Sequence, residues 1–136
     1  MATGETLFDQ TLVLKGARIL IVEDEYYIAD DLRREFRAAG ADVVGPVSTL
    51  ETAHRALDEN EFDCALLDLN LHGESAIPIA DRLVERRTPF AIATGYGSGA
   101  VPDRFKAVPR IEKPFDPTAL LQLVSELKCG QSNPRS

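Results

Sequence analysis

The sequence predicts one α/β domain in which five short strands alternate with helices. Short runs rich in Ile, Val, Leu and Ala alternate with segments whose apolar residues recur at helical spacing. Strands separated by helical crossovers must run parallel to one another. We therefore expect a parallel sheet with helices on both faces, which is a three-layer (βα)5 sandwich.

Five apolar runs are expected to form the sheet. They lie at 17–22, 43–47, 64–67, 90–93 and 108–111. The third and fourth runs are apolar throughout, which is typical of central strands buried on both faces. The second and fifth contain Pro46 and Pro109, which have no N–H to donate and therefore fit sheet edges. Edges at strands two and five correspond to the flavodoxin-like order 2-1-3-4-5.

Four helices are indicated by apolar residues three or four positions apart. These residues are Ile28, Leu32, Phe36 and Ala39; Leu50, Ala53 and Leu57; Ile79, Ala80, Leu83 and Val84; and Leu120, Val124 and Leu127. Ser48 or Thr49, Ser75 and Asp116 suit the N-cap position, and Pro117 suits the first helical turn. Gly40 favours the end of the first helix.

The segment 95–102 interrupts the alternation where the fourth helix should begin. It contains three glycines and Pro102, so only residues 101–107 could form a turn or two of helix. We expect a fourth helix that is either short or mobile. Both interpretations stay open at this stage: a loop with a short helix, or a mobile binding surface.

Length and composition limit the classes of protein that this chain can represent. With 136 residues it is expected to form one domain over 16–128, flanked by an N-terminal extension at 1–15 and a tail at 129–136. The formal net charge of −7 argues against binding to nucleic acid or to an anionic membrane surface. No apolar run approaches the ~20 residues of a membrane span, and no signal peptide is visible. We expect a cytoplasmic protein, without a disulfide framework because the two cysteines lie far apart.

The predicted carboxyl ends of the strands carry a small set of polar residues. Glu23 and Asp24 follow the first strand, and Asp68 follows the third, which is its neighbour in the predicted order. Three converging carboxylates repel one another unless a cation lies between them. Oxygen ligands at an open rim favour Mg²⁺.

Two further residues at the same edge suggest phosphoryl transfer. Thr94 follows the fourth strand and Lys113 follows the fifth. A hydroxyl, an ammonium and a metal ion could together neutralise phosphoryl oxygens, and Asp68 is the best placed acceptor. Each residue alone would be an ordinary turn or cap residue. Their joint occurrence at one edge favours in-line attack by Asp68 on a phosphoryl donor.

Four segments resemble the receiver domain of bacterial response regulators. They are IVEDE (21–25), ALLDLNLHGE (65–74), ATGYG (93–97) and EKPF (112–115), in that order within residues 17–128. The resemblance implies that a histidine kinase transfers a phosphoryl group to Asp68, with Thr94 and Lys113 contacting it. It also implies Mg²⁺ bound by Asp24, Asp68 and the backbone carbonyl of Asn70, with Glu23 acting through water. Such a domain catalyses only its own phosphorylation and dephosphorylation.

Several positions depart from the usual receiver pattern. Arg110 replaces an aromatic residue that rotates inward in many receivers, and His72 replaces a common proline. The stretch from Pro89 to Tyr96 is similar to the FATGUY subgroup, which lacks the aromatic switch and includes single-domain regulators. Tyr96 could shield an acyl phosphate or simply close a loop. A cis peptide is frequent in the family at the position of Lys113–Pro114.

The resemblance and the chain length together suggest how the signal is passed on. Only nine residues follow Leu127, so we expect a single-domain response regulator. Its partners would be a sensor histidine kinase and a downstream protein or phosphotransfer protein. The alternatives are a phosphorylation-independent interaction module and a receiver cut from a hybrid kinase. An aspartyl phosphatase is disfavoured because Asn70 cannot protonate a leaving group. We expect residues 95–107 to become ordered on phosphorylation.

Overall fold

The computed structural model describes residues 13–95 and 101–131, with side chains described as far as Lys128. Its main sheet contains five parallel strands in the order β2-β1-β3-β6-β7, which confirms the predicted order of the first to fifth strands. The strands are β1 (Arg18–Val22), β2 (Asp42–Val47), β3 (Cys64–Asp68), β6 (Phe90–Thr94) and β7 (Arg110–Glu112).

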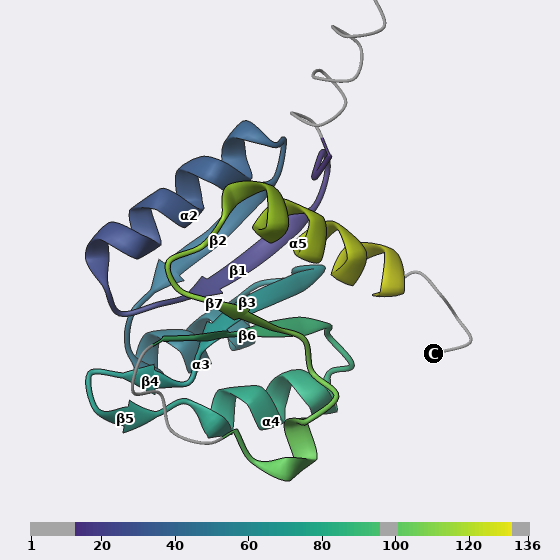
Figure 1. Ribbon diagram of the computed structural model, residues 1–136. Coiled ribbons are helices and arrows are strands. Elements are labelled where there is room, and N and C mark those ends of the chain that lie inside the picture. The colour runs from purple at the N-terminus through teal and green to yellow at the C-terminus, as the bar shows by residue number, and fades with distance from the viewer. Residues whose placement is uncertain (1–12, 96–100, 132–136) are drawn as a thin grey trace, which may run out of the picture.

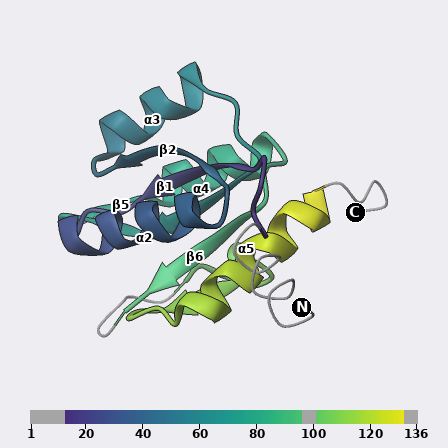
Figure 2. The same ribbon diagram turned by 90° about the horizontal axis from the view of Figure 1, so that it is seen from above.

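Two helices cover each face of the sheet. Helices α2 (Tyr26–Ala38) and α5 (Pro117–Gln131) lie on one face, and α3 (Leu50–Glu59) and α4 (Ile77–Glu85) lie on the other (Figures 1 and 2). Successive strand residues alternate between the two cores. Ile19, Ile21 and Leu66 pack toward α2 and α5, whereas Leu20 and Leu67 pack toward α3 and α4. This three-layer arrangement follows from the period of two along each buried strand.

The helix starts largely follow the predicted caps. The Thr49 hydroxyl accepts the Thr52 N–H at 3.1 Å, and Asp116 Oδ2 accepts the Ala119 N–H at 3.0 Å. Ser75, predicted as the N-cap of the third helix, lies one residue before the observed N-cap. Its hydroxyl accepts the Ile77 N–H at 3.2 Å, but the N-cap of α4 is Ala76. Val84, predicted on the apolar face of α4, is instead 52% exposed.

The connection from β6 to β7 contains one turn of 3-10 helix, η1 (Asp103–Phe105), as the predicted short fourth helix. Phe105 is buried and meets Phe90 edge to face, with ring centroids 6.3 Å apart. Arg104 donates two hydrogen bonds of 3.0 Å to the Asp81 carboxylate on α4. Residues 101–107 are thus anchored by packing and by an ion pair. Residues 96–100, with Tyr96, lie outside the described residues.

Two local features differ from the predictions or extend them. The fifth strand begins at Arg110 rather than at position 108, so Pro109 precedes it and accepts the Ile92 N–H at 2.8 Å. Leu14 is completely buried in the core that α2 and α5 cover.

Among the described residues, no helix has the length and apolar character needed to cross a membrane.

A short hairpin that the sequence did not predict follows β3. Strands β4 (Asn70–Leu71) and β5 (Glu74–Ser75) pair antiparallel, and only His72 and Gly73 connect them. Both residues have positive φ, 52° and 87°, as two-residue turns of type I′ require. The Gly73 N–H also donates to the Asn70 side-chain oxygen at 2.8 Å. The hairpin therefore has a specific turn conformation.

Candidate phosphoryl-transfer and metal site

The predicted site residues meet at the carboxyl edge of the sheet. Oxygen atoms of Glu23, Asp24 and Asp68 all lie within 4.8 Å of one another. They stand at the ends of β1 and β3, which are neighbours in the sheet. Thr94 and Lys113 join Asp24 and Asp68 in lining a pocket of about 1090 Å³. Adjacent parallel strands place their following residues together, which explains this convergence.

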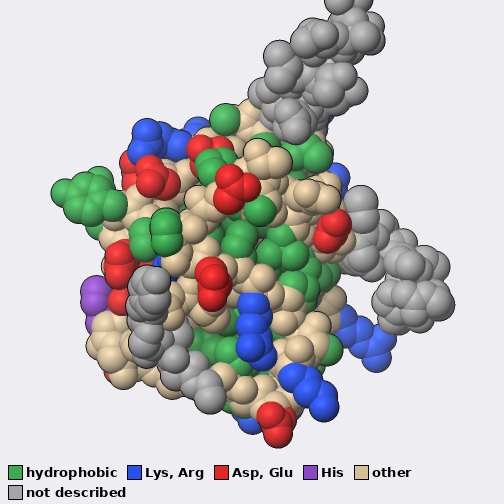
Figure 3. Space-filling view, viewed as in Figure 1, with side chains coloured by type: hydrophobic (Ala, Val, Ile, Leu, Met, Phe, Trp, Pro, Cys, Tyr) green, Lys and Arg blue, Asp and Glu red, His purple; other side chains and the backbone are tan. Residues whose placement is uncertain are grey.

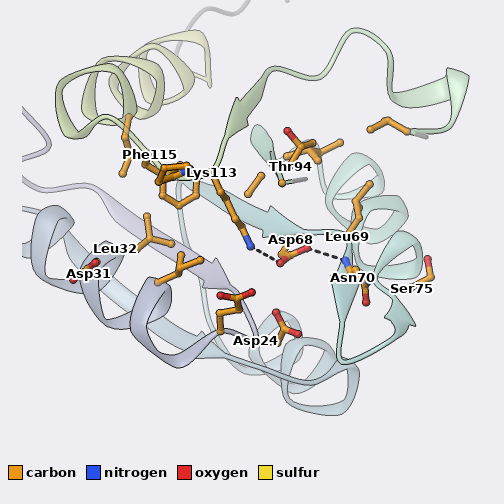
Figure 4. A pocket seen from close by; sticks show the side chains of 18 of the residues that line it. Asp24, Asp31, Leu32, Asp68, Leu69, Asn70, Ser75, Thr94, Lys113 and Phe115 are labelled. Atoms are coloured by element: carbon orange, nitrogen blue, oxygen red, sulfur yellow. Dashed lines mark hydrogen bonds and ion pairs between the residues drawn. The ribbon is translucent and has the colours of Figure 1, made fainter. Parts of the chain in front are cut away.

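Lys113 forms the centre of this cluster. Its ammonium Nζ lies 2.7 Å from Asp68 Oδ2 and 2.8 Å from Glu23 Oε1, and its side chain is only 14% exposed. Figure 4 shows the lysine extending from the end of β7 across the pocket to Asp68. The Lys113 N–H donates to the Thr94 carbonyl at 2.7 Å, and the Lys113–Pro114 peptide is cis. The ammonium therefore pairs with two of the three carboxylates.

The cluster changes the proton affinity of two of its members. The pKa of Glu23 is raised from 4.5 to about 7, chiefly by burial and to a smaller extent by the Asp68 charge, against the opposing effects of Lys113 and of the Glu25 N–H. Burial alone would lower the pKa of Lys113, but its hydrogen bonds and charge interactions with Asp68 and Glu23 outweigh that effect. The net result is a raised pKa, so the Lys113 ammonium stays charged at neutral pH.

Backbone N–H groups hold one oxygen of each carboxylate. Asn70 donates to Asp68 Oδ1 at 2.9 Å, Glu25 donates to Glu23 Oε2 at 3.0 Å, and His72 donates to Asp24 Oδ2 at 2.8 Å. A hydrogen bond of this kind is stronger than one between neutral groups whenever the accepting carboxylate is ionised. The carboxylates are consequently oriented by main-chain donors from two segments, the one after β1 and the β4–β5 hairpin.

Thr94 differs from the acidic residues in its orientation. It lines the pocket, but its hydroxyl donates to the Ile111 carbonyl at 3.5 Å. Figure 4 shows the Thr94 oxygen turned away from Asp68. Arg110, at the position of the usual aromatic switch, is exposed on β7 and is not among the residues that line this pocket.

The donor set suits a hard divalent cation. Three carboxylates supply oxygen ligands, and Asn70 at the pocket wall offers a backbone carbonyl as well. Lys113 supplies one positive charge to a cluster of three carboxylates, which favours a further cation beside them. All of these donors are oxygen atoms, which favour Mg²⁺ over softer transition metals.

The pocket includes residues that the sequence reasoning did not assign to the site. From the acidic cluster it continues along α2 past Ile28, Asp31 and Glu35 and reaches Phe115 beyond β7. The first three of these recur at helical spacing after Asp24, which is the signal that could have placed them on the same face. In the space-filling view, acidic side chains lie along the left margin, toward which β1 points in Figure 1 (Figure 3).

Residues 19–125 match the response regulator receiver domain family. The chain belongs to this family. The sheet order, the paired acidic residues after β1, the aspartate at the end of β3 and the lysine after β7 are therefore the parts of a receiver domain. Receiver domains bind Mg²⁺ at such an acidic pocket.

Similar proteins include both curated sequences and solved structures. A sensory transduction protein of Bacillus anthracis, LytT, is 30% identical over 115 residues, which cover 82% of this chain and 47% of that protein. The chain thus spans about half the length of the curated relatives it matches. The solution structure of SdrG from Sphingomonas melonis is 36% identical with a TM-score of 0.75, covering 82% of this chain and 95% of that one. The receiver domain of Erythrobacter litoralis PhyR, at 24% identity and a TM-score of 0.74, shares the fold over 90% and 98% of the two chains.

Proposed function

We propose that this protein receives a phosphoryl group on Asp68 from a histidine kinase in two-component signal transduction. The observation that carries the proposal is the Lys113 ammonium held between Asp68 and Glu23, next to Asp24, at the carboxyl edge of the sheet. This arrangement combines an acceptor carboxylate, a cation-binding cluster and a fixed positive charge in one open pocket. Phosphoryl transfer depends mainly on positioning and on charge stabilisation of this kind.

The reaction forms one bond and breaks another. An Asp68 carboxylate oxygen attacks phosphorus in line with the phosphohistidine nitrogen. The P–N bond breaks with its electron pair moving to that nitrogen, and the kinase leaves with a neutral imidazole that keeps the proton already on its other ring nitrogen. The product is an acyl phosphate on Asp68. Lys113 then contacts a phosphoryl oxygen instead of the carboxylate oxygen that it pairs with at 2.7 Å.

The remaining site residues have complementary roles in the proposal. Asp24, Asp68 and the Asn70 carbonyl would hold Mg²⁺ directly, and Glu23 would hold a metal-bound water. The ion supplies charge neutralisation and orientation for the phosphoryl oxygens. Thr94 must turn its hydroxyl away from the Ile111 carbonyl to donate to the phosphoryl group.

The identity of the partners is also part of the proposal. A cytoplasmic sensor histidine kinase would act as donor, and output would pass through contact with a downstream protein or through a phosphotransfer protein. The sequence from Pro89 to Tyr96 and the exposed Arg110 support the FATGUY subgroup. The chain would then catalyse only its own phosphorylation and dephosphorylation.

Intact-mass measurement after incubation with a small-molecule phosphodonor tests the proposal. We expect one phosphoryl adduct with Mg²⁺, and none with EDTA or in Asp68→Asn. Asp42→Asn is a matched control, because Asp42 is exposed on the edge strand β2 and lies outside the cluster. An adduct that persists in Asp68→Asn would contradict the assignment of the acceptor.

If the small molecule gives no adduct, a phosphohistidine-bearing kinase domain replaces it as donor. Absence of transfer from both donors would favour the alternative function, a phosphorylation-independent interaction module.

A further inference from the structure

We propose that His72 is a positioning residue for the metal site, acting through its backbone N–H on Asp24. This inference rests on the proposed function and adds a role for the β4–β5 hairpin. The His72 N–H donates to Asp24 Oδ2 at 2.8 Å across 48 positions of sequence. It is the turn of the hairpin that supplies the donor, so the loop after the acceptor aspartate fixes a carboxylate of another loop.

The backbone conformation at the turn makes this contact possible. His72 has a φ of 52° and is followed by Gly73 with a φ of 87°, the pair of positive φ values that a type I′ turn requires. Proline could not occupy this position, because its ring fixes φ near −65° and removes the N–H. The departure from the usual proline at position 72 therefore has a structural reason in this chain.

The imidazole has a smaller part than the main chain. Its Nδ1 lies 3.6 Å from the same Asp24 oxygen, beyond hydrogen-bond distance, and the side chain is 65% exposed. The Asp24 side chain is only 15% exposed. A carboxylate so nearly enclosed, with one oxygen fixed by an N–H, presents its other oxygen in a restricted direction. This restriction reduces the ordering required when a cation binds.

Amide NMR tests the contact itself in the full chain. We expect the His72 amide proton to be shifted downfield and to exchange slowly, and both properties to be lost in Asp24→Ala. The Gly73 amide is an internal control, because it donates to Asn70 inside the hairpin and should be unaffected in that variant. A His72 amide that is unchanged in Asp24→Ala would overturn the proposal.

Variants at position 72 test the consequence for metal binding. His72→Gly keeps the N–H and favours positive φ, so we expect its Mg²⁺ dissociation constant to stay within roughly twofold of wild type. His72→Pro removes the donor and cannot adopt the positive φ of the turn, and we expect affinity to fall about tenfold. Equal loss in Gly and Pro variants would assign the role to the imidazole and overturn the proposal, as would equal retention in both.

These results can be separated from the fate of the proposed function. Phosphorylation of Asp68 in the wild-type chain is measured by mass, independently of the His72 amide. If Asp68 is phosphorylated but the His72 amide does not respond to Asp24→Ala, only the positioning role of His72 is contradicted. A chain that shows the coupling but accepts no phosphoryl group from any donor would sink the proposed function and leave the contact established.

Discussion

The side chains on the two sides of the pocket are held in place to different degrees. On the side of β1 and β3, each carboxylate accepts a backbone N–H at 2.8–3.0 Å, and Lys113 pairs with Asp68 and Glu23. On the side of β6, the Thr94 hydroxyl makes one long hydrogen bond within the described part of the chain, 3.5 Å to the Ile111 carbonyl and pointing away from Asp68. In the proposed function, the acceptor and the metal ligands are thus already oriented, whereas the hydroxyl that would contact the phosphoryl group has to move.

This difference suggests that phosphoryl transfer and the response to it depend on different residues: transfer on the oriented carboxylates and Lys113, and the response on Thr94. Preorganised donors and charges need no rearrangement when the phosphoryl group arrives, which favours transfer. A weakly held hydroxyl can change partner at small cost, which suits the residue that reports the modification. Beyond it, Phe105 and the Arg104–Asp81 ion pair anchor η1. We therefore expect any rearrangement to fall between Thr94 and this anchor, rather than over all of residues 95–107.

Replacing Lys113 should have the largest effect on stability, because this residue pairs with two carboxylates on the side of β1 and β3. Lys113→Ala leaves the buried Glu23 and Asp68 carboxylates facing each other without a cation, and we expect unfolding free energy to fall by about 3 kcal/mol at neutral pH without metal. Mg²⁺ should restore part of this loss. Urea denaturation with and without Mg²⁺ measures both effects. Lys106→Ala, at an exposed lysine, is the matched control and should change stability little. An equally stable Lys113→Ala protein would show that the ammonium does not hold the cluster together.

Replacing a metal ligand should remove the response to Mg²⁺. A ligand at a hundred times its dissociation constant stabilises a native protein by about 2.7 kcal/mol. We expect wild-type chain to gain up to that amount on addition of Mg²⁺ and Asp24→Asn to gain almost none. Thermal melting over a range of Mg²⁺ concentrations is the measurement. If Mg²⁺ stabilises Asp24→Asn as much as wild type, the ion does not bind at this cluster.

Glu23 should make the metal-free protein sensitive to pH. Its pKa is raised from 4.5 to about 7 in the folded chain, so between these values the folded state binds more protons than the unfolded state. Stability without metal should therefore fall as pH rises from about 4.5 to about 7, and Mg²⁺ affinity should rise over the same range. Glu23→Gln should flatten both profiles. Chemical denaturation at a series of pH values gives the first profile, and profiles identical to wild type in Glu23→Gln would assign the titration to another group.

Replacing the switch hydroxyl should have the smallest effect on the resting protein. Thr94→Ala removes one long hydrogen bond, and we expect unfolding free energy to change by less than about 1 kcal/mol. The change should appear only when a phosphate mimic is bound: amide exchange near Gly95 should respond in wild type and not in Thr94→Ala. Amides around Phe105 should stay protected in both. A large loss of stability without ligand would contradict the comparison between the two sides.

Much of the fold could be predicted because each strand and helix carries its own pattern. The apolar third and fourth runs and Pro46 in the second strand predicted the sheet order, whereas Pro109, used as a second edge signal, lies just before the fifth strand. Position 84 was misassigned, since helical spacing alone does not show where the edge of a buried stripe lies; Val84 is half exposed. The boundary of the last strand was also wrong by two residues, because Val108 and Pro109 are as apolar as a strand.

The convergence of the site residues followed from topology, but their contacts did not. Glu23, Asp24 and Asp68 were expected together because neighbouring parallel strands end at one edge. The hairpin at 70–75 was missed, although His72-Gly73 resembles a two-residue turn, because strands of two residues leave no periodic signal. The orientation of Thr94 depends on a side-chain rotamer, which sequence does not encode locally.

Chemical mapping of the modified residue tests the central claim most directly. After phosphorylation, borohydride reduction converts an aspartyl phosphate into homoserine, and peptide mass spectrometry locates the converted position. We expect homoserine at position 68 alone, and only when Mg²⁺ was present. Homoserine at position 24 or 63, or a phosphoryl adduct that borohydride does not convert at any aspartate, would contradict Asp68 as the phosphoacceptor.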